Sequence, residues 1–293
     1  MVRALANIGH DVISYDVKDW KFGKIDKIEP VYGNTLEGEH LKGQIRKVDM
    51  VFHLAAIPFI PDGYINPRKV VETDIIGTLN VLLALKEHKV PLIHYSSSET
   101  YGGAKYNPID ESHPTEPKST YAAAKLGAER LVYTFCNENR IPYTILRQFN
   151  VIGPDDTHPR IVPLIISQLQ DSNTVMVGNT NTSRDFTYVT DAVDACLKTI
   201  DNQKAINQTI NIGTGRAISI WNLIQIISQK MIGKMADVAV DKARFRPLDV
   251  NLLCADNRKA KQLLGWQPQI GLNDALDKII SWRKNHLFEF ESQ

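Results

Sequence analysis

The 293-residue sequence lacks several features that would each assign it to a class of protein. Its three cysteines, Cys136, Cys196 and Cys254, are far apart and match neither a disulfide framework nor the spacing of metal ligands. No apolar stretch approaches the ~18 residues of a membrane span, and the first residues lack the apolar segment of a signal peptide. We therefore expect a reduced, cytoplasmic protein without a metal site.

Charge of one sign is also lacking. The 34 lysines and arginines nearly balance the 33 aspartates and glutamates, so the formal net charge is +1. This balance gives no electrostatic reason to expect a nucleic acid or an anionic membrane as partner. The length suits one large domain or two intimate ones, and the 43% hydrophobic content is ample for a core.

The pattern that is present alternates strand-like with helix-like segments, which predicts an α/β fold with a parallel sheet. The expected strands cover residues 12–16, 48–54, 91–96 and 142–146. The expected helices cover residues 69–88, 119–137, 162–169, 191–200, 220–231 and 272–284. Because the spacing loosens after Asn150, we predict a dinucleotide-binding domain over 1–150 and a smaller substrate lobe over 151–293, with a soft boundary.

The most informative absence concerns the start of this fold. A doubly wound dinucleotide-binding sheet begins with a strand, a Gly-rich turn and a helix whose N-terminus holds a pyrophosphate. This sequence has no G-x-G-x-x-G, and it opens in an apparent helix, followed by a turn at Gly9 and a strand ending in Asp16. We expect a fold without its first strand and glycine loop, as in a truncated form of a longer protein. The neighbours of that central strand would then be unpaired, unless the chain has a different fold.

The strongest chemical signal combines a serine cluster with a Tyr–Lys pair. Residues 96–102 read Ser-Ser-Ser-Glu-Thr-Tyr-Gly after an expected strand, and Tyr121-Ala-Ala-Ala-Lys125 follows on an expected helix. Residues at i and i+4 share a helix face, so the ammonium lies near the phenol. A phenol with a pKa of ~10 is a poor base at neutral pH, but a nearby cation and a positively charged nicotinamide favour phenolate. Surface helices often carry this spacing, yet the preceding serine cluster favours catalysis.

These motifs resemble the extended short-chain dehydrogenase/reductase family, in its NAD-dependent epimerase/dehydratase group that acts on nucleotide sugars. The resemblance covers nearly the whole chain. Further matching segments are His53–Ala56, Gly77–Asn80, Arg147–Pro154, Arg184–Val189, Asn211–Gly213, Arg246–Asp249 and Leu264–Pro268. The family implies a Rossmann-type sheet, NAD, a nucleotide-diphosphate sugar as substrate, a homodimer and a place in polysaccharide or activated-sugar synthesis.

The resemblance also implies the residues that act at the cofactor and the reacting sugar. Tyr121 would remove a proton from a sugar hydroxyl, and Lys125 would tune it and bind the nicotinamide ribose. Ser97 would be the hydroxyl helper, with Ser98 and Glu99 beside it. The residues implied near the cofactor are Asp16, Leu54, Ala55, Ala56 and Ser96, together with Tyr121 and Lys125.

Some of these implied roles have plain alternatives. Asp16 would bind the adenosine ribose and favour NAD over NADP, although it could instead cap a turn. Ala55 and Ala56 could be an ordinary buried strand end. Asn150, Arg184 and Arg246 fall where the family contacts the nucleotide diphosphate, for which the planar guanidinium fork is suited.

Glu99 bears on the reaction that follows C4 oxidation to a 4-keto sugar, the chemistry that the family shares. The family's 4,6-dehydratases and glucuronate decarboxylases resemble this chain in having Glu here, where it could remove the C5 proton. The dehydratases often have Asp beside that Glu, whereas this chain has Ser98. We predict 4,6-dehydratase-like chemistry, with UDP-glucose 4-epimerase or UDP-glucuronate decarboxylase as alternatives. A structural Glu99 and a non-catalytic sugar-nucleotide-binding relic also stay open.

Further departures from the family accompany the missing glycine loop, which puts cofactor binding by this chain in doubt. Asp74 stands where the family often has Asn, and Leu248 replaces a usual Gly. The implied homodimer would pair the helices at 69–88 and 119–137. Apolar residues of the second helix could equally belong to the core: Leu126, Leu131, Val132 and Phe135.

Overall fold

The computed structural model describes residues 1–286 and residue 290, and it divides into two compact units. Unit 1 comprises Met1–Ser96, Ser119–Leu146 and Val193–Ile210. Unit 2 comprises Ser97–Lys118, Arg147–Ala192 and Asn211–Gln293. Within the described ranges, no helix combines the length and the apolar character that crossing a membrane requires.

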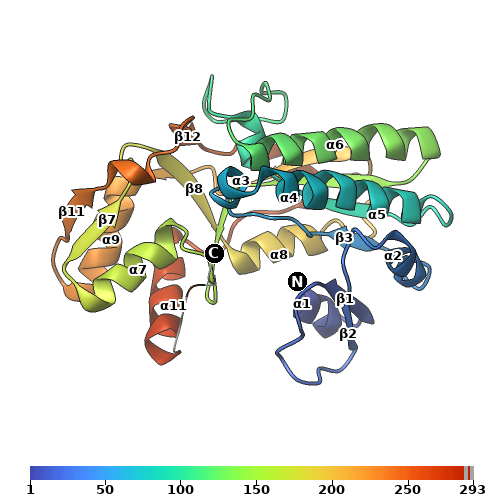
Figure 1. Ribbon diagram of the computed structural model, residues 1–293, viewed down its shortest axis with the longest axis horizontal. Coiled ribbons are helices and arrows are strands. Elements are labelled where there is room, and N and C mark those ends of the chain that lie inside the picture. The colour runs from blue at the N-terminus through green and yellow to red at the C-terminus, as the bar shows by residue number, and fades with distance from the viewer. Residues whose placement is uncertain (287–289, 291–293) are drawn as a thin grey trace. The chain divides into compact units, whose positions relative to one another are not determined.

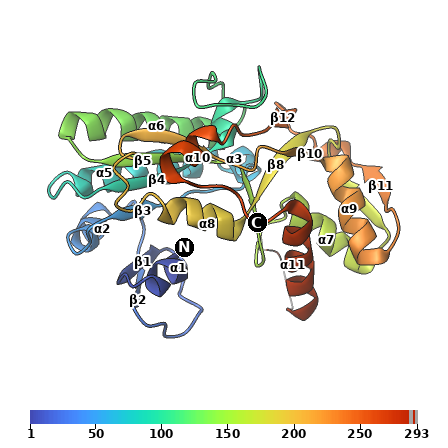
Figure 2. The same cartoon turned by 180° about the vertical axis from the view of Figure 1, so that it is seen from behind.

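The strands of unit 1 belong to two separate sheets. The larger sheet has the strand order β3 (Val51–His53), β4 (Leu92–Ser97), β5 (Tyr143–Gln148) and β9 (Gln208–Ile212). β4 and β5 are seen side by side in the view from behind (Figure 2). The smaller sheet is the parallel pair of β1 (Val12–Asp16) and β2 (Ile28–Tyr32).

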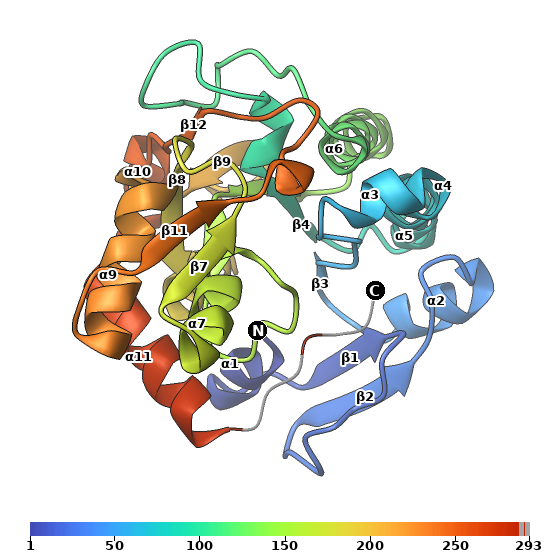
Figure 3. The same cartoon turned by 60° about the vertical axis from the view of Figure 1, so that its left-hand side comes forward.

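Neither β1 nor β3 has a second strand partner among the described residues. β1 pairs with β2 alone, β3 pairs in parallel with β4 alone, and Figure 3 shows the β1–β2 pair apart from β3. These are the two strands that flank the first strand of a doubly wound sheet. The prediction of a Rossmann-type sheet with an unfilled central position is therefore confirmed.

A long helical segment and α6 (Thr120–Asn139) lie side by side in unit 1 (Figure 1). The first consists of α4 (Pro67–Val71), a π-helical turn η1 (Glu72–Ile76) and α5 (Gly77–Leu85). α6 begins where the Ser119 side chain accepts a hydrogen bond from the Ala122 N–H at 3.1 Å, as an N-cap does. Buried residues of α5, α6, β4 and β5 form one core: Val81, Leu82, Leu85, Leu92, Val132 and Ile145. Val132 is thus a core residue.

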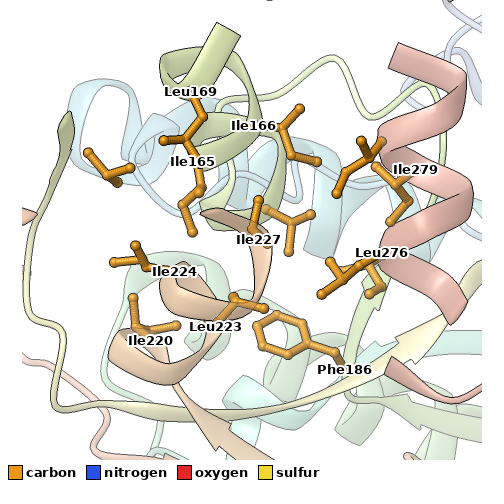
Figure 4. Packing of buried hydrophobic residues seen from close by; sticks show 14 of the residues in the cluster. Ile165, Ile166, Leu169, Phe186, Ile220, Leu223, Ile224, Ile227, Leu276 and Ile279 are labelled. Atoms are coloured by element: carbon orange, nitrogen blue, oxygen red, sulfur yellow. The ribbon is translucent and has the colours of Figure 1, made fainter. Parts of the chain in front are cut away.

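Unit 2 is built around α7 (Ile161–Asp171), α9 (Ile220–Ile232) and α11 (Leu272–Asn285). On α9 the apolar residues recur with the spacing of a single helix face, as expected for an amphipathic helix packed on one side. Figure 4 shows them converging with residues of the other two helices and with Phe186: Ile165, Ile166, Leu169, Ile220, Leu223, Ile224, Ile227, Leu276 and Ile279. This cluster is the core of unit 2.

The strands of unit 2 form two small sheets beside these helices. β8 (Ser183–Tyr188) is central to one, with β10 (Ala217–Ser219) antiparallel and β6 (Asn150–Ile152) and β12 (Leu252–Leu253) parallel to it. β7 (Thr174–Val177) and β11 (Asp237–Val240) form a parallel pair. The remaining helices of the two units are α1 (Val2–Asn7), α2 (Gly38–Ile45), α3 (Asp62–Ile65), α8 (Val189–Leu197), α10 (Arg258–Leu264) and the 3₁₀ turns η2 (Ser98–Tyr101) and η3 (Lys242–Arg244).

Candidate functional site

The Tyr121–Lys125 face of α6 is fixed against the serine-rich end of β4. Both side chains are buried, and the Lys125 ammonium donates a hydrogen bond to the Tyr95 carbonyl oxygen. One turn further along α6, Glu129 accepts a hydrogen bond from the Ser96 hydroxyl. The helix is therefore tied to the strand by two polar contacts, and Ser96 has a partner within the protein.

Lys125 is a buried cation with carboxylates as its charged neighbours. Burial lowers the pKa of Lys125, whereas the nearby carboxyl groups of Asp74 and Glu129 raise it. An ammonium held in this way is a fixed positive charge beside the Tyr121 phenol on the same helix face. The arrangement can therefore favour phenolate, the form in which tyrosine acts as a base.

The four predicted cofactor residues of β1 and β3 lie at the carboxyl ends of these strands. Leu54 and Ala55 are exposed directly after β3, and Ala56 is partly exposed. Asp16 is exposed at the end of β1, where its Oδ1 accepts the Lys18 N–H at 2.9 Å. Turn capping by Asp16 is thus present, and ribose binding by its carboxylate stays a prediction.

The predicted cofactor contacts of these residues concern the two riboses of the implied NAD. Lys125, a buried cation, is predicted to bind the nicotinamide ribose, and Asp16, an exposed carboxylate, is predicted to bind the adenosine ribose. A diphosphate is ordinarily held by backbone N–H groups of a Gly-rich turn at a helix N-terminus, and the described residues contain no such turn. The predicted contacts therefore concern the two ends of a dinucleotide, and the usual diphosphate-binding turn is not among the described residues.

In unit 2, the turn that follows Ser97 and contains Ser98 and Glu99 is anchored by the side chain of its last residue, Tyr101. The Ser97 Oγ accepts the Glu99 N–H at 3.2 Å, and all three residues are buried. Tyr101 is 1% exposed and donates its hydroxyl to Asn211 Oδ1 at 2.7 Å. Burial and these two hydrogen bonds therefore fix the turn that carries the predicted Ser97 hydroxyl and Glu99 carboxylate.

Gly102 ends this turn in a conformation that excludes a side chain. Its φ is +69°, and a Cβ built on it would lie 1.6 Å from the carbonyl oxygen of Glu116. We predict that Gly102→Ala lowers the free energy of unfolding by roughly 3 kcal/mol, from left-handed strain plus overpacking. Gly233→Ala is the control, because Gly233 has the same φ of +69° and nothing within 4 Å of its Cβ position. Urea unfolding should show a loss of only about 1 kcal/mol there, and equal losses would contradict the steric argument.

The structure brings Glu99 together with both predicted diphosphate-binding arginines in unit 2. Arg246 Nη1 lies 3.7 Å from Glu99 Oε1, and the Glu99 carboxylate also acts on the buried Arg184. Burial is the main cause that lowers the pKa of Arg184. Asn150 Oδ1 is buried without a hydrogen-bond partner among the described residues, as expected for an acceptor that would bind a ligand.

Asp249 belongs to this cluster, although no role was assigned to it from the sequence. Its Oδ1 lies 4.0 Å from Arg184 Nη2, and its Oδ2 accepts the Asn179 side-chain N–H at 3.0 Å. The Asp249 carboxylate thus pairs with the buried Arg184 guanidinium. Its place at the end of the Arg246–Asp249 motif was the signal that could have identified it.

Comparison with known proteins places this arrangement in a family. The model of the GDP-mannose 4,6 dehydratase family matches residues 8–279. A putative UDP-glucose 4-epimerase of Methanocaldococcus jannaschii is 32% identical over 251 residues, 84% of this chain and 80% of that protein. A dTDP-D-glucose 4,6-dehydratase of Homo sapiens is 28% identical over 255 residues, 85% of this chain and 72% of that protein.

A solved structure agrees over almost the whole chain. MoeE5 in complex with UDP-glucose and NAD superposes with a TM-score of 0.87 at 28% identity, covering 97% of this chain and 94% of that one. The names of the relatives include both epimerases and dehydratases. Nucleotide-sugar chemistry is common to them, whereas the outcome of the reaction differs.

Proposed function

Because the chain belongs to the GDP-mannose 4,6-dehydratase family of NAD-dependent, extended short-chain dehydrogenases/reductases, we propose that it oxidises C4 of a nucleotide-diphosphate hexose. The observation that carries the proposal is the buried Lys125 ammonium on the Tyr121 face of α6, fixed to the serine-rich end of β4. Bound NAD would supply the hydride acceptor in this chemistry. The residues of the chain would bind and orient the sugar and take up the proton of its C4 hydroxyl.

Tyr121 is proposed as the base that takes the proton from the C4 hydroxyl as C4 becomes a ketone. Lys125 lowers the cost of the phenolate and donates to the nicotinamide ribose. Ser97 hydrogen-bonds the reacting oxygen. Unit 1 carries Asp16, Tyr121 and Lys125, and unit 2 carries Arg184 and Arg246. The proposed division is a cofactor domain over about 1–150 and a substrate lobe over about 151–293. The two compact units differ from it in that residues 97–118 belong to unit 2 and residues 193–210 belong to unit 1.

We propose dehydration as the step that follows oxidation. A 4-ketone acidifies the C5 proton, and Glu99 would remove it while the C6 hydroxyl takes up a proton and leaves as water. Return of the hydride to C6 and of a solvent proton to C5 would then give the deoxy methyl group and restore NAD. Arg184 and Arg246 supply the positive charge that suits a diphosphate, and the unpartnered Asn150 oxygen supports a polar ligand beside them. Ser98, in place of the Asp that dehydratases often have, favours the alternatives of 4-epimerisation or uronate decarboxylation.

The experiment begins with the NAD content per chain and continues with NAD-loaded protein and a panel of UDP-, dTDP- and GDP-sugars followed by proton NMR. Loss of the C5 proton signal with a new deoxy methyl signal supports dehydration. An inverted C4 configuration supports epimerisation, and release of CO₂ from a uronate supports decarboxylation. Unchanged spectra for every sugar, from protein that holds NAD, would contradict C4 oxidation altogether.

We also propose a homodimer formed through the α4–α5 and α6 side of unit 1. Apolar side chains on this helical side are exposed to solvent: Ile65, Val71, Ile76 and Leu83. Leu83→Glu is therefore expected to convert a dimer to a monomer in light scattering, because Leu83 is 52% exposed on α5. Leu248→Glu is the control, since Leu248 is 61% exposed in unit 2. A monomeric starting protein would contradict the proposal.

A cellular role completes this proposal. The family resemblance favours the supply of activated sugars for polysaccharide synthesis in the cytoplasm. The free thiols of Cys136, Cys196 and Cys254, all buried, are compatible with a reducing compartment.

A further inference from the structure

Asp74 is a buried carboxyl group in the π-helical turn between α4 and α5. It is 1% exposed, and its Oδ1 accepts the Ile57 N–H at 2.9 Å. Its Oδ2 is buried and has no hydrogen-bond partner among the described residues. A half-satisfied buried carboxyl is costly, and π turns frequently occur at functional positions. The residue therefore requires an explanation beyond its one backbone contact.

The π turn packs against α6, where Ile57 and Ile75, the neighbours of Asp74, lie in one buried cluster with Tyr121 and Ala124. Lys125 of the same helix is the cation that acts on this carboxyl group. Burial raises the pKa of Asp74 to about 6, against the opposing effect of Lys125. The effect is mutual, because the Asp74 carboxyl group raises the pKa of Lys125 more than Glu129 does. Asp74 is thus coupled to the ammonium proposed to act on Tyr121, without being part of the Tyr–Lys pair.

The other ionisable groups around Asp74 do not replace this coupling. Burial lowers the pKa of His53 on β3 to about 3 and lowers that of His94 on β4 well below its ordinary value, so both are neutral. On α6, Glu129 accepts the Ser96 hydroxyl and is a second carboxyl neighbour of Lys125.

Of the helices on either side of the π turn, α4 carries two further cations, Arg68 and Lys69, and both are exposed. The α5 segment has no ionisable residue and contributes Thr78, whose hydroxyl donates to the Asp74 carbonyl oxygen at 2.6 Å. On the exposed side, Arg68 of α4 pairs with Glu72 at 3.3 Å. Lys125 is consequently the positive charge that the buried Asp74 carboxyl senses.

We propose that Asp74 is a tuning residue for the base: its carboxylate opposes the positive field of Lys125 and so sets the pH range in which the Tyr121 phenol ionises. This inference rests on the proposed function of Tyr121 and Lys125. A negative charge near the pair disfavours phenolate, so the neutral Asn should make phenolate form at lower pH. For one unit charge on the neighbouring helical segment, the shift is on the order of one pH unit.

Asp74→Asn is the test, because Asn has the same shape and keeps an oxygen for the Ile57 N–H. The ionisation of Tyr121 is read in the NAD-loaded protein as the ultraviolet phenolate signal that is lost in Tyr121→Phe. The pH profile of kcat/KM on a sugar that is turned over gives a second readout. Glu72→Gln is the matched control, with the same loss of charge in the same π turn on a side chain that is 44% exposed.

The expected result is a shift of both profiles to lower pH by about one unit in Asp74→Asn and no shift in Glu72→Gln. Unmoved profiles in Asp74→Asn would overturn the inference and leave Asp74 as an anchor for Ile57. A shift to higher pH would also overturn it, because Asp74 would then act by keeping Lys125 protonated. If no sugar is turned over, the proposed function fails, while the phenolate signal still decides the role of Asp74.

Discussion

Replacing Tyr121 with Phe is expected to lower kcat by about 10²- to 10⁴-fold, because the variant has no group to accept the C4 hydroxyl proton. The aromatic ring stays in its buried position near the start of α6, so the fold should be retained. Affinity for the nucleotide sugar should change little, since the hydroxyl serves the reaction more than binding. Steady-state kinetics and calorimetric titration with the same sugar measure the two effects separately.

Tyr133→Phe is the control for this prediction. Tyr133 lies on the same helix and is 54% exposed, so loss of its hydroxyl should leave kcat unchanged. Turnover that survives in Tyr121→Phe would exclude Tyr121 as the base and direct attention to another proton acceptor. If the unaltered protein and Tyr121→Phe bind the sugar equally well and neither of them turns it over, the chain is a non-catalytic sugar-nucleotide-binding protein.

Segments with strong hydrophobic patterns were predictable from the sequence. Residues 12–16 form β1 as expected, and the helices expected at 119–137 and 220–231 correspond to α6 and α9 within about two residues. In contrast, β2 and α2 were not predicted. β2 contains Pro30 and is largely exposed, and α2 contains Gly38 and Gly43, so neither has the composition of its class. Tertiary contacts therefore decide these two elements.

The candidate site was predictable to the extent that it is local in the sequence. The Tyr–Lys face follows from helix geometry alone, because i and i+4 are neighbours in any α-helix. The ion pair of Glu99 with Arg246 joins positions far apart in the chain, and no spacing rule indicates it. The coupling of Asp74 to Lys125 depends on a π turn that interrupts the helix expected over 69–88. Such contacts become visible when the elements are packed.

Glu99→Gln is expected to separate oxidation from elimination. Without a carboxylate to remove the C5 proton, formation of the deoxy sugar should fall by about 10²- to 10⁴-fold. Oxidation at C4 uses Tyr121 and should still occur, so up to one 4-keto sugar per bound NAD should form, together with the reduced cofactor. In D₂O, proton NMR would show deuterium entering C5 with the unaltered protein and not with the variant.

Two controls distinguish loss of the base from loss of the Arg246 ion pair. Glu99→Asp keeps a negative charge near Arg246 and should preserve sugar binding, while the shorter side chain slows elimination. Glu116 belongs to the same unit and forms an exposed ion pair with Lys105. Glu116→Gln removes that carboxylate and should change neither oxidation nor elimination. If deuterium still enters C5 in Glu99→Gln, another group is the base and the carboxylate serves to hold Arg246. If no deuterium enters C5 even with the unaltered protein while C4 inverts, the reaction is 4-epimerisation, and Ser98 in place of Asp is then its sequence signature.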